Sequence, residues 1–483
     1  MTVLKGRNFI VNGQVIPPEP TDNVIITITM SSPTTPTLSF ADMKYNKRCG
    51  MLMVADDGFE SDYTQLYAYL HGGFPASNGT TYPGIRGTDG CGNPLEWHAT
   101  FALNGGPRDE HIQGIDRAIW SEYNIMLANG YGLSNHGFDH GGYDKYYQVK
   151  QNEKYLFEKT GYRVRTMTIP TADEGYSETA PSLGYKLVGS TFGANSADDN
   201  NETGNQHVIF GSKVDVKTID QTRLNKFLFA RYFSLYWEPN DVNELKTLMD
   251  AVGNGSASGA QKFMGHFGMH GKDYQGSIAN FIEVMQYFKN HANGGDNMWF
   301  PNMQEFVEYY ETKINAIKNV TVQGNVLTAE INLSSIDSSS RLRDMSLLLG
   351  GANIQSISVS GADSYTYNTS TGLINIFKKN QSVRNPYADA VPPQIVECQR
   401  VGSNLTIIYD RPITQTVFQS AYGSAYSITN NTINSITGSG TTWTINCQSP
   451  IAASQTFDYK MQRGNAAGLD GLKVCSYIGY PIP

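Results

Sequence analysis

Cysteine is scarce in this chain, and its few copies follow no pairing pattern. The 483 residues contain five, none of them in a CxxC pair: Cys49, Cys91, Cys398, Cys447 and Cys475. An odd and scattered set is not typical of a disulfide framework. We therefore expect free buried thiols, with one bridge among the last three cysteines as the alternative.

Charge and long apolar runs are also limited. Charged residues make up 17% of the chain, and the formal net charge is -8. Nucleic-acid binding needs clustered Lys and Arg, so no nucleic-acid partner is expected. No stretch of eighteen apolar residues occurs, which predicts that the chain does not span a membrane. The beginning, MTVLKGRNFIVNGQVIPPEP, has neither a continuous apolar core nor a cleavage site, so it does not indicate a secretion signal.

The chain is long enough for roughly two to four domains. Residues 1–44 contain two short β-like runs and a Pro/Ser/Thr stretch, and we interpret them as an attachment segment and linker, or as a strand laid on the next domain. Residues 45–317 alternate apolar runs with helical periodicity, which predicts an α/β domain. Residues 318–390 and 391–483 lose that periodicity and predict two β-sandwich modules.

Polar motifs follow three predicted strands of the α/β domain, where such sheets place their sites. The first is Asp56-Asp57-Gly58, after the buried run GMLMVA. Two adjacent carboxylates repel each other, so placing both at an apolar strand end requires a cation or a basic partner. A turn with solvated aspartates is the competing interpretation.

The second motif is NHGFDH, which places His136 and His140 four residues apart after a short strand. Two such histidines can share one cation, and with one carboxylate they suit Zn²⁺ with open positions for water. A lone HxxxH spacing is weak on its own. The third motif, FMGHFGMH, offers His266 and His270. A histidine there could protonate a leaving group; a structural histidine pair or a second metal site are the alternatives.

The order of these motifs resembles the NodB-type polysaccharide deacetylases, a carbohydrate esterase family, over about residues 50–310. The segments that carry the resemblance are DDG, ATFALN, a helix and GYGLSNHGFDH. The resemblance implies a distorted β/α barrel and hydrolysis of acetyl groups. It implies Asp56 as general base, Asp57, His136 and His140 as metal ligands, and His266 as general acid.

The chain departs from the family pattern in its third motif. That motif places an arginine just before a proline to orient the base, whereas here Thr168 and Ile169 precede Pro170. Arg165, or Arg163, is the substitute the sequence offers. Trp237 corresponds loosely to the tryptophan that packs on the acid histidine. We assign Pro170, Trp237 and His270 to substrate binding.

These features predict metal-dependent deacetylation of an acetylated polysaccharide of a cell wall, capsule or other surface. The cofactor is a divalent ion, with Zn first and Co, Ni or Mn as alternatives. The last segment, PPQIVECQRVGSNLTIIYDRPI, resembles bacterial immunoglobulin-like modules. The alternative is a catalytically weak or inactive glycan-binding component of a phage tail or fibre. We expect an extracellular, cell-surface or virion-associated protein, with other virion proteins or further copies of the chain as candidate partners.

Overall fold

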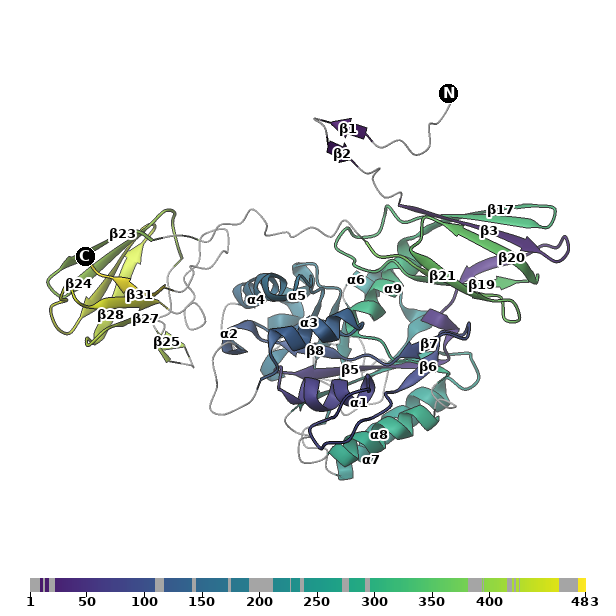
Figure 1. Ribbon diagram of the computed structural model, residues 1–483, viewed down its shortest axis with the longest axis horizontal. Helices are drawn as coiled ribbons and strands as arrows, with labels where there is room; N and C mark the ends of the chain where they lie inside the picture. Colours follow the sequence, from purple (N-terminus) through teal and green to yellow (C-terminus); the bar gives the residue numbers. More distant parts are fainter. Residues whose placement is uncertain are drawn as a thin grey trace.

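The computed structural model describes most of the chain in three folded units. The described residues are 9–11, 14–16, 22–108, 117–140, 145–172, 175–190, 212–225, 227–234, 239–271, 278–291, 296–380, 393, 395–414, 419–420, 423–424, 426–459 and 477–483. They form a barrel and two β-sandwiches, together with a short hairpin of β1 (Phe9–Val11) and β2 (Gln14–Ile16) (Figure 1). Within these residues, no helix has the length and apolar character needed to cross a membrane.

The barrel is built on a mainly parallel sheet in the order β12-β15-β5-β8-β9-β10-β11-β13. Its strands are β5 (Cys49–Asp56), β8 (Thr100–Leu103), β9 (Gly132–Asn135), β10 (Thr166–Thr168), β11 (Leu187–Ser190), β12 (Lys213–Asp215), β13 (Phe227–Ala230) and β15 (Phe263–His270). β16 (Met298–Trp299) adds to β5, and only β12 pairs antiparallel. The predicted α/β sheet is therefore present.

A single segment closes this sheet into a distorted barrel. β13 pairs with β11 at one end of the strand order, and β14 (Tyr232–Ser234) pairs with β15 near the other end. Only Arg231 separates β13 from β14. The chain therefore crosses the seam at this residue, and whatever side chain stands there lies between the two ends of the sheet.

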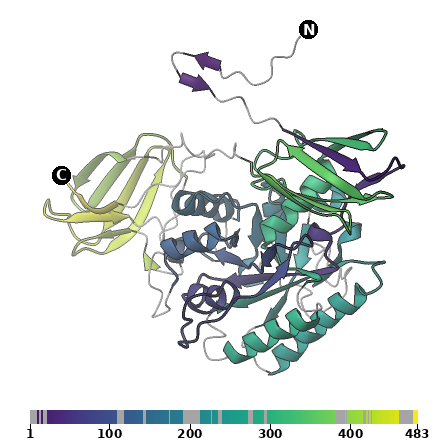
Figure 2. The same ribbon diagram turned by 45° about the vertical axis from the view of Figure 1, so that its right-hand side comes forward.

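Helices cover the barrel. They are α1 (Ala68–Leu70), which continues a π-helix over Asp62–Tyr67, α2 (Gly105–Arg108), α3 (Trp120–Ala128), α4 (Lys145–Thr160), α5 (Gly175–Ser182), α6 (Gln221–Asn225), α7 (Pro239–Gly255), α8 (Ile278–His291) and α9 (Met303–Asn315). α7 and α8 pack side by side on one flank (Figures 1 and 2). A small hairpin of β6 (Arg86–Thr88) and β7 (Pro94–Glu96) lies outside the sheet. Short 3₁₀ turns lie over Lys44–Asn46, Pro170–Ala172 and Val216–Thr218.

The last of these helices, α9, closes the amino-terminal end of the barrel. Asn302 caps this helix, because its Oδ1 accepts a hydrogen bond from Glu305 N at 2.9 Å. The amide of Met303 donates to Thr100, the first residue of β8. Met303 and Phe306 pack in one apolar cluster with Leu52 and Val54 of β5. The helix therefore fills the end of the barrel opposite to the carboxyl ends of the strands.

The first sandwich consists of two four-stranded sheets, β17-β18-β3-β20 and β21-β22-β19-β4. Its strands are β3 (Asn23–Met30), β4 (Thr37–Phe40), β17 (Ile317–Gln323), β18 (Val326–Asn332), β19 (Met345–Gly350), β20 (Ile354–Ser360), β21 (Ser364–Asn368) and β22 (Leu373–Phe377). The prediction of a separate segment and linker over residues 1–44 is therefore wrong for β3 and β4. Val24, Ile26 and Ile28 of β3 alternate into the sandwich core, which is why that strand pairs with β18, some 300 positions further on.

Buried ion pairs join this sandwich to α9 and the barrel. Lys44 Nζ lies 2.8 Å from Glu305 of α9 and 2.7 Å from Asp344 of the sandwich. Burial alone would lower the pKa of Lys44, but Asp344 and Glu305 hold it well above its usual range. Removing Lys44 would leave both buried carboxylates without this partner, and breaking a buried ion pair in this way costs about 3–5 kcal/mol. The sandwich is thus fixed at the amino-terminal end of the barrel.

The last module is a second, smaller sandwich. One sheet has the order β23-β24-β29-β28, with β23 (Ile395–Val401), β24 (Asn404–Tyr409), β28 (Ile433–Ser439) and β29 (Thr442–Cys447). The other contains β27 (Tyr426–Ile428), β30 (Thr456–Tyr459) and β31 (Tyr477–Pro481), and β25 (Gln419–Ser420) pairs with β26 (Gly423–Ser424). Cys49, Cys398 and Cys447 are free buried thiols, as expected, whereas Cys91 is free but only partly buried; Cys475 lies outside the described residues. The predicted boundary near residue 391 also falls outside them.

Candidate metal centre and active site

The two adjacent aspartates lie at the carboxyl end of β5 and leave it in different directions. Asp56 is the last residue of the strand, whereas Asp57 has a φ of 73° and Gly58 a φ of 74°. Aspartate tolerates this left-handed region better than most residues, and glycine enters it freely. The turn is held by a hydrogen bond from Asp57 N to Ala102 O at 2.9 Å. Neighbouring carboxylates therefore reach two different sets of partners.

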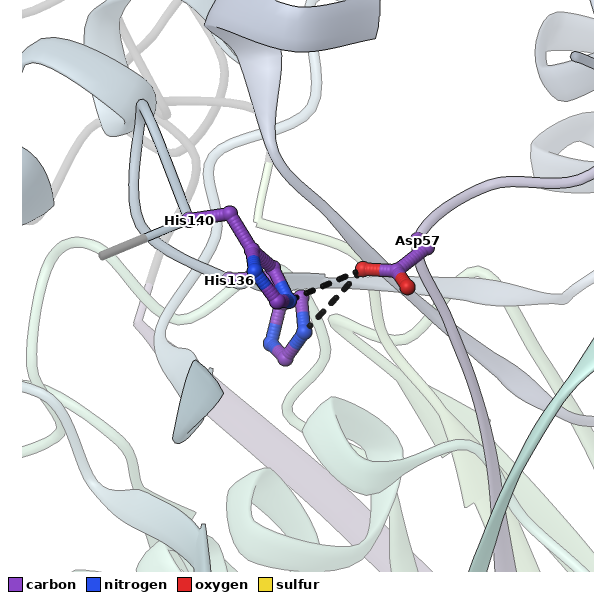
Figure 3. Close-up of side chains that lie close together, drawn as sticks. All are labelled: Asp57, His136 and His140. Carbon is purple, nitrogen blue, oxygen red and sulfur yellow. Dashed lines mark ion pairs between the residues drawn. The ribbon is translucent and has the colours of Figure 1, made fainter. Parts of the chain in front are cut away.

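Asp57 faces the two histidines of the NHGFDH loop (Figure 3). Its Oδ1 lies 3.1 Å from His140 Nε2 and 3.4 Å from His136 Nε2. One ligand atom from each of the three residues can be chosen so that all lie within 4.8 Å of one another. Four ligands at Zn–N and Zn–O bond lengths of about 2.0–2.1 Å stand roughly 3.3 Å apart in a tetrahedral site. The observed separations fit that geometry.

The tautomer of His136 also fits a cation. Its Nδ1 lies 2.8 Å from the carbonyl oxygen of Thr168, which can only accept a hydrogen bond. Nδ1 therefore carries the proton, and in the neutral ring Nε2 presents its lone pair toward Asp57. A lone pair facing a carboxylate is repulsive unless a proton or a metal ion lies between them. A carbonyl that fixes a histidine in this way is the usual support of a metal ligand.

The electrostatics of Asp57 are those of an ionised carboxylate. Burial would raise the pKa of its carboxyl, but His136 and His140 hold that pKa well below its usual range. The carboxylate is thus ionised, and two imidazoles with one negative charge form a donor set suited to Zn²⁺ or a similar divalent ion. The structure brings together the three residues that the sequence nominated as ligands.

Asp56 is held by an arginine that the sequence analysis did not choose. Arg231 donates to both carboxylate oxygens of Asp56, at 2.7 Å each, and both side chains are buried. The prediction that Arg165 orients the base is therefore wrong. Its guanidinium contacts Glu311 instead, at 2.7 and 3.0 Å, at the junction with the first sandwich. The available signal for Arg231 was an arginine interrupting the apolar run FLFARYF at a strand end.

The prediction that His266 is the general acid is also wrong, because the strand register places this residue away from the aspartates. In the pairing of β15 with β5, His266 lies opposite Leu52, whereas His270 lies opposite Asp56. Four residues of strand correspond to roughly 13 Å. His266 is fully buried with its ring against Phe229, at 4.8 Å between centroids. His270 is the one at the site: its Nε2 lies 3.5 Å from Asp57 Oδ2, and its side chain is 22% exposed.

Burial of His266 should make the stability of the fold depend on pH. Burial, and then the charge of Arg231, lower its pKa from 6.5 to about 3. The unfolded chain therefore binds a proton below pH 6.5 that the native chain does not, and stability falls as the pH falls through that range. Between pH 6.5 and 5 the loss is about 2 kcal/mol. Urea unfolding of the metal-free protein at both pH values should show this loss, and the variant His266→Leu should lack it; an equal loss in both proteins would contradict the assignment.

Of the remaining predicted site residues, Pro170 and Arg163 belong to the described part of the chain and Trp237 does not. Pro170 is buried and lies against Gly137, next to His136: a Cβ added to Gly137 would stand 3.5 Å from Pro170 Cγ. Trp237 lies outside the described residues. Arg163, the other arginine that the sequence offered for orienting the base, lies at the opposite end of the barrel. Its backbone carbonyl accepts a hydrogen bond from Gln304 of α9, which closes that end. Of the predicted substrate-binding set, Pro170 and His270 therefore lie at the carboxyl end of the strands, where Asp56 and Asp57 stand.

No protein-family model matches this chain, and no curated protein sequence matches it. Some solved structures are similar in part. A polysaccharide deacetylase from Bacillus cereus is 12% identical over 53% of this chain and 91% of that chain, with a TM-score of 0.27. A probable polysaccharide deacetylase from Pseudomonas aeruginosa PAO1 is 12% identical over 56% and 92%, with a TM-score of 0.34. A Streptococcus pyogenes deacetylase in complex with acetate is 16% identical over 29% and 55%, with a TM-score of 0.22, so the match spans about half of that protein. Values this low assign no family, and the function has to be argued from the site.

Proposed function

We propose that this protein is a metal-dependent deacetylase of an acetylated polysaccharide. The observation that carries the proposal is that a candidate cation site and a buried carboxylate lie side by side at the carboxyl end of β5. Asp57, His136 and His140 offer a three-ligand cation site. Asp56 lies beside it and accepts two hydrogen bonds from Arg231. Three protein ligands leave a position open for water or substrate, which distinguishes a hydrolytic site from a closed structural one.

The neighbouring carboxylate supplies the base. A divalent ion in this site would polarise an acetyl carbonyl and make water a better nucleophile. Asp56 Oδ2 lies 3.8 Å from His136 Nε2, close to where such an ion would be held. It accepts the proton of the attacking water, while Arg231 keeps the carboxylate oriented and balances its buried charge. Loss of Arg231 would leave that charge unpaired.

The proton for the leaving group comes from His270, in place of the predicted His266. His270 is partly exposed beside Asp57, whereas burial lowers the pKa of His266, which disfavours the imidazolium form that a general acid needs. Protonation of the departing amine or alcohol would then release acetate and the free sugar group. The ring of His270 also meets Phe59 edge to face, with 6.4 Å between centroids, which limits its orientations.

Acetate release tests the function directly. The full chain, loaded with Zn²⁺, is incubated with a panel of N- and O-acetylated polysaccharides, and released acetate is measured with and without chelator. We expect release from at least one polymer, loss of release with chelator, and recovery when Zn²⁺, Co²⁺, Ni²⁺ or Mn²⁺ is returned. A metal-loaded protein that binds a glycan but releases no acetate would instead favour the glycan-binding virion component as its function.

A further inference from the structure

Both histidines of the metal centre lie in one short loop, and one helix holds that loop at two points. The loop runs from Asn135, the last residue of β9, to His140. Gly137 and His140 in this loop have positive φ values of 73° and 60°. Such a backbone does not fix itself by secondary-structure hydrogen bonds, so the surroundings must define it. The surroundings are Gln148 and Asn152, which stand four residues apart on the same face of α4.

Asn152 fixes the beginning of the loop. Its Nδ2 donates to Leu103 O at 2.6 Å and to Asn135 Oδ1 at 2.8 Å, and its Oδ1 accepts from Gly105 N at 2.8 Å. Leu103 and Asn135 are the last residues of β8 and β9. One fully buried amide therefore ties two strand ends to α4.

Asn135 passes this constraint to the first histidine ligand. Its Oδ1 accepts from Gly137 N at 3.0 Å as well as from Asn152, and its Nδ2 donates to Val149 O at 2.8 Å and Tyr185 Oη at 2.7 Å. All four hydrogen-bonding positions of this buried amide are used. The backbone on either side of His136 is consequently fixed before any ion arrives.

Gln148 fixes the middle of the loop, next to the second histidine ligand. Its Oε1 accepts from Asp139 N at 2.7 Å, and its Nε2 donates to Asp139 Oδ2 at 2.9 Å. Gln148 is 2% exposed, so water does not offer an easy substitute for these two bonds. Asp139 precedes His140 directly, and the pair therefore limits where the imidazole of His140 can stand.

We propose that Gln148 and Asn152 are positioning residues of the metal centre, which set the separation of His136 and His140 to match a divalent ion. This inference rests on the proposed metal site. A ligand pair that must first be ordered binds an ion more weakly, because the ordering free energy is subtracted from binding. Loss of such supporting bonds elsewhere reduces metal affinity by about 10–100-fold.

Two near-isosteric substitutions, Asn152→Leu and Gln148→Met, test the proposal in the full chain. Their matched controls are Asn375→Leu and Gln304→Met. Asn375 is a buried asparagine of the first sandwich that contacts Asp89 and Thr366, and Gln304 is a buried glutamine of α9 that contacts Arg163 and Glu308. Zn²⁺ affinity is measured by chelator competition, the visible absorption of bound Co²⁺ reports ligand geometry, and thermal unfolding reports stability.

We expect each α4 variant to bind Zn²⁺ about 10–100-fold more weakly and to change the Co²⁺ spectrum. The controls should lose stability but keep the wild-type affinity and spectrum. Folded α4 variants with wild-type affinity would overturn the positioning role while leaving the proposed function intact. A wild-type protein that binds neither ion would refute the metal site, and this inference with it. If Asn152→Leu does not fold, Gln148→Met decides; failure of both to fold would overturn the proposal in favour of a structural role.

Discussion

Replacing Asp57 by alanine is expected to abolish metal binding and, with it, acetate release. Asp57 supplies the only negative charge among the three candidate ligands, and its Oδ1 lies 3.1 Å from His140 Nε2 and 3.4 Å from His136 Nε2. Without it, only two imidazole ligands and no anionic ligand remain, which is too few to hold Zn²⁺ tightly. The loss of Zn²⁺ affinity should exceed the roughly 10–100-fold that removal of a supporting hydrogen bond costs.

Chelator competition with Zn²⁺ and metal analysis of the purified variant measure this effect. Asp215→Ala is the matched control, because Asp215 is a buried aspartate of the same barrel that caps a 3₁₀ turn by accepting from Lys217 N. It should lose about 0.5–2 kcal/mol of stability, as caps do, and keep its metal. Wild-type affinity in Asp57→Ala would mean that the ion, if one binds, is held elsewhere.

Replacing Asp56 by asparagine should lower turnover strongly without removing the metal. The amide cannot take a proton from water, and loss of a general base lowers turnover by roughly 10²–10⁴-fold. The three ligands are untouched, so Zn²⁺ affinity should stay within about threefold of wild type. The structure adds a cost that the sequence did not reveal. The amide has one oxygen instead of two, so Arg231 loses one of its two charge-assisted bonds and faces an NH₂ group instead.

Stability must therefore be measured beside activity in this variant. Initial rates of acetate release, Zn²⁺ affinity and the unfolding midpoint should be compared with those of Asp215→Asn, where asparagine is as good a cap as aspartate and little should change. A folded, metal-loaded Asp56→Asn protein with full activity would remove Asp56 from the mechanism and leave the base unassigned.

The candidate metal site was the feature most accessible from sequence. Asp57, His136 and His140 each stand at or just after the end of a parallel strand, and the carboxyl ends of such strands meet at one edge. A buried apolar run followed by DDG, and a short strand followed by NHGFDH, therefore predicted proximity without any long-range information. The structure places the three side chains within contact of one another.

The same reasoning failed for the third motif, on β15, because the pairing register of a strand cannot be predicted from its own sequence. β15 is eight residues long, and both His266 and His270 lie on it. Their spacing of four places both on the same face of the strand, so alternation could not separate them. Only the pairing with β5, which puts His270 opposite Asp56, showed which histidine reaches the strand end.

Local sequence patterns were sufficient to identify which residues can ligate a cation and which strand ends carry them. Three further features became clear only from the three-dimensional structure. They are the arginine that pairs with Asp56, the histidine that lies beside Asp57, and the sheets that β3 and β4 join. The physical reason is that the first set depends on backbone geometry over a few residues. The second depends on contacts between distant segments, such as Arg231 with Asp56 across the barrel seam and β3 with β18 across the whole barrel sequence, and their free energy comes from burial that no local pattern records.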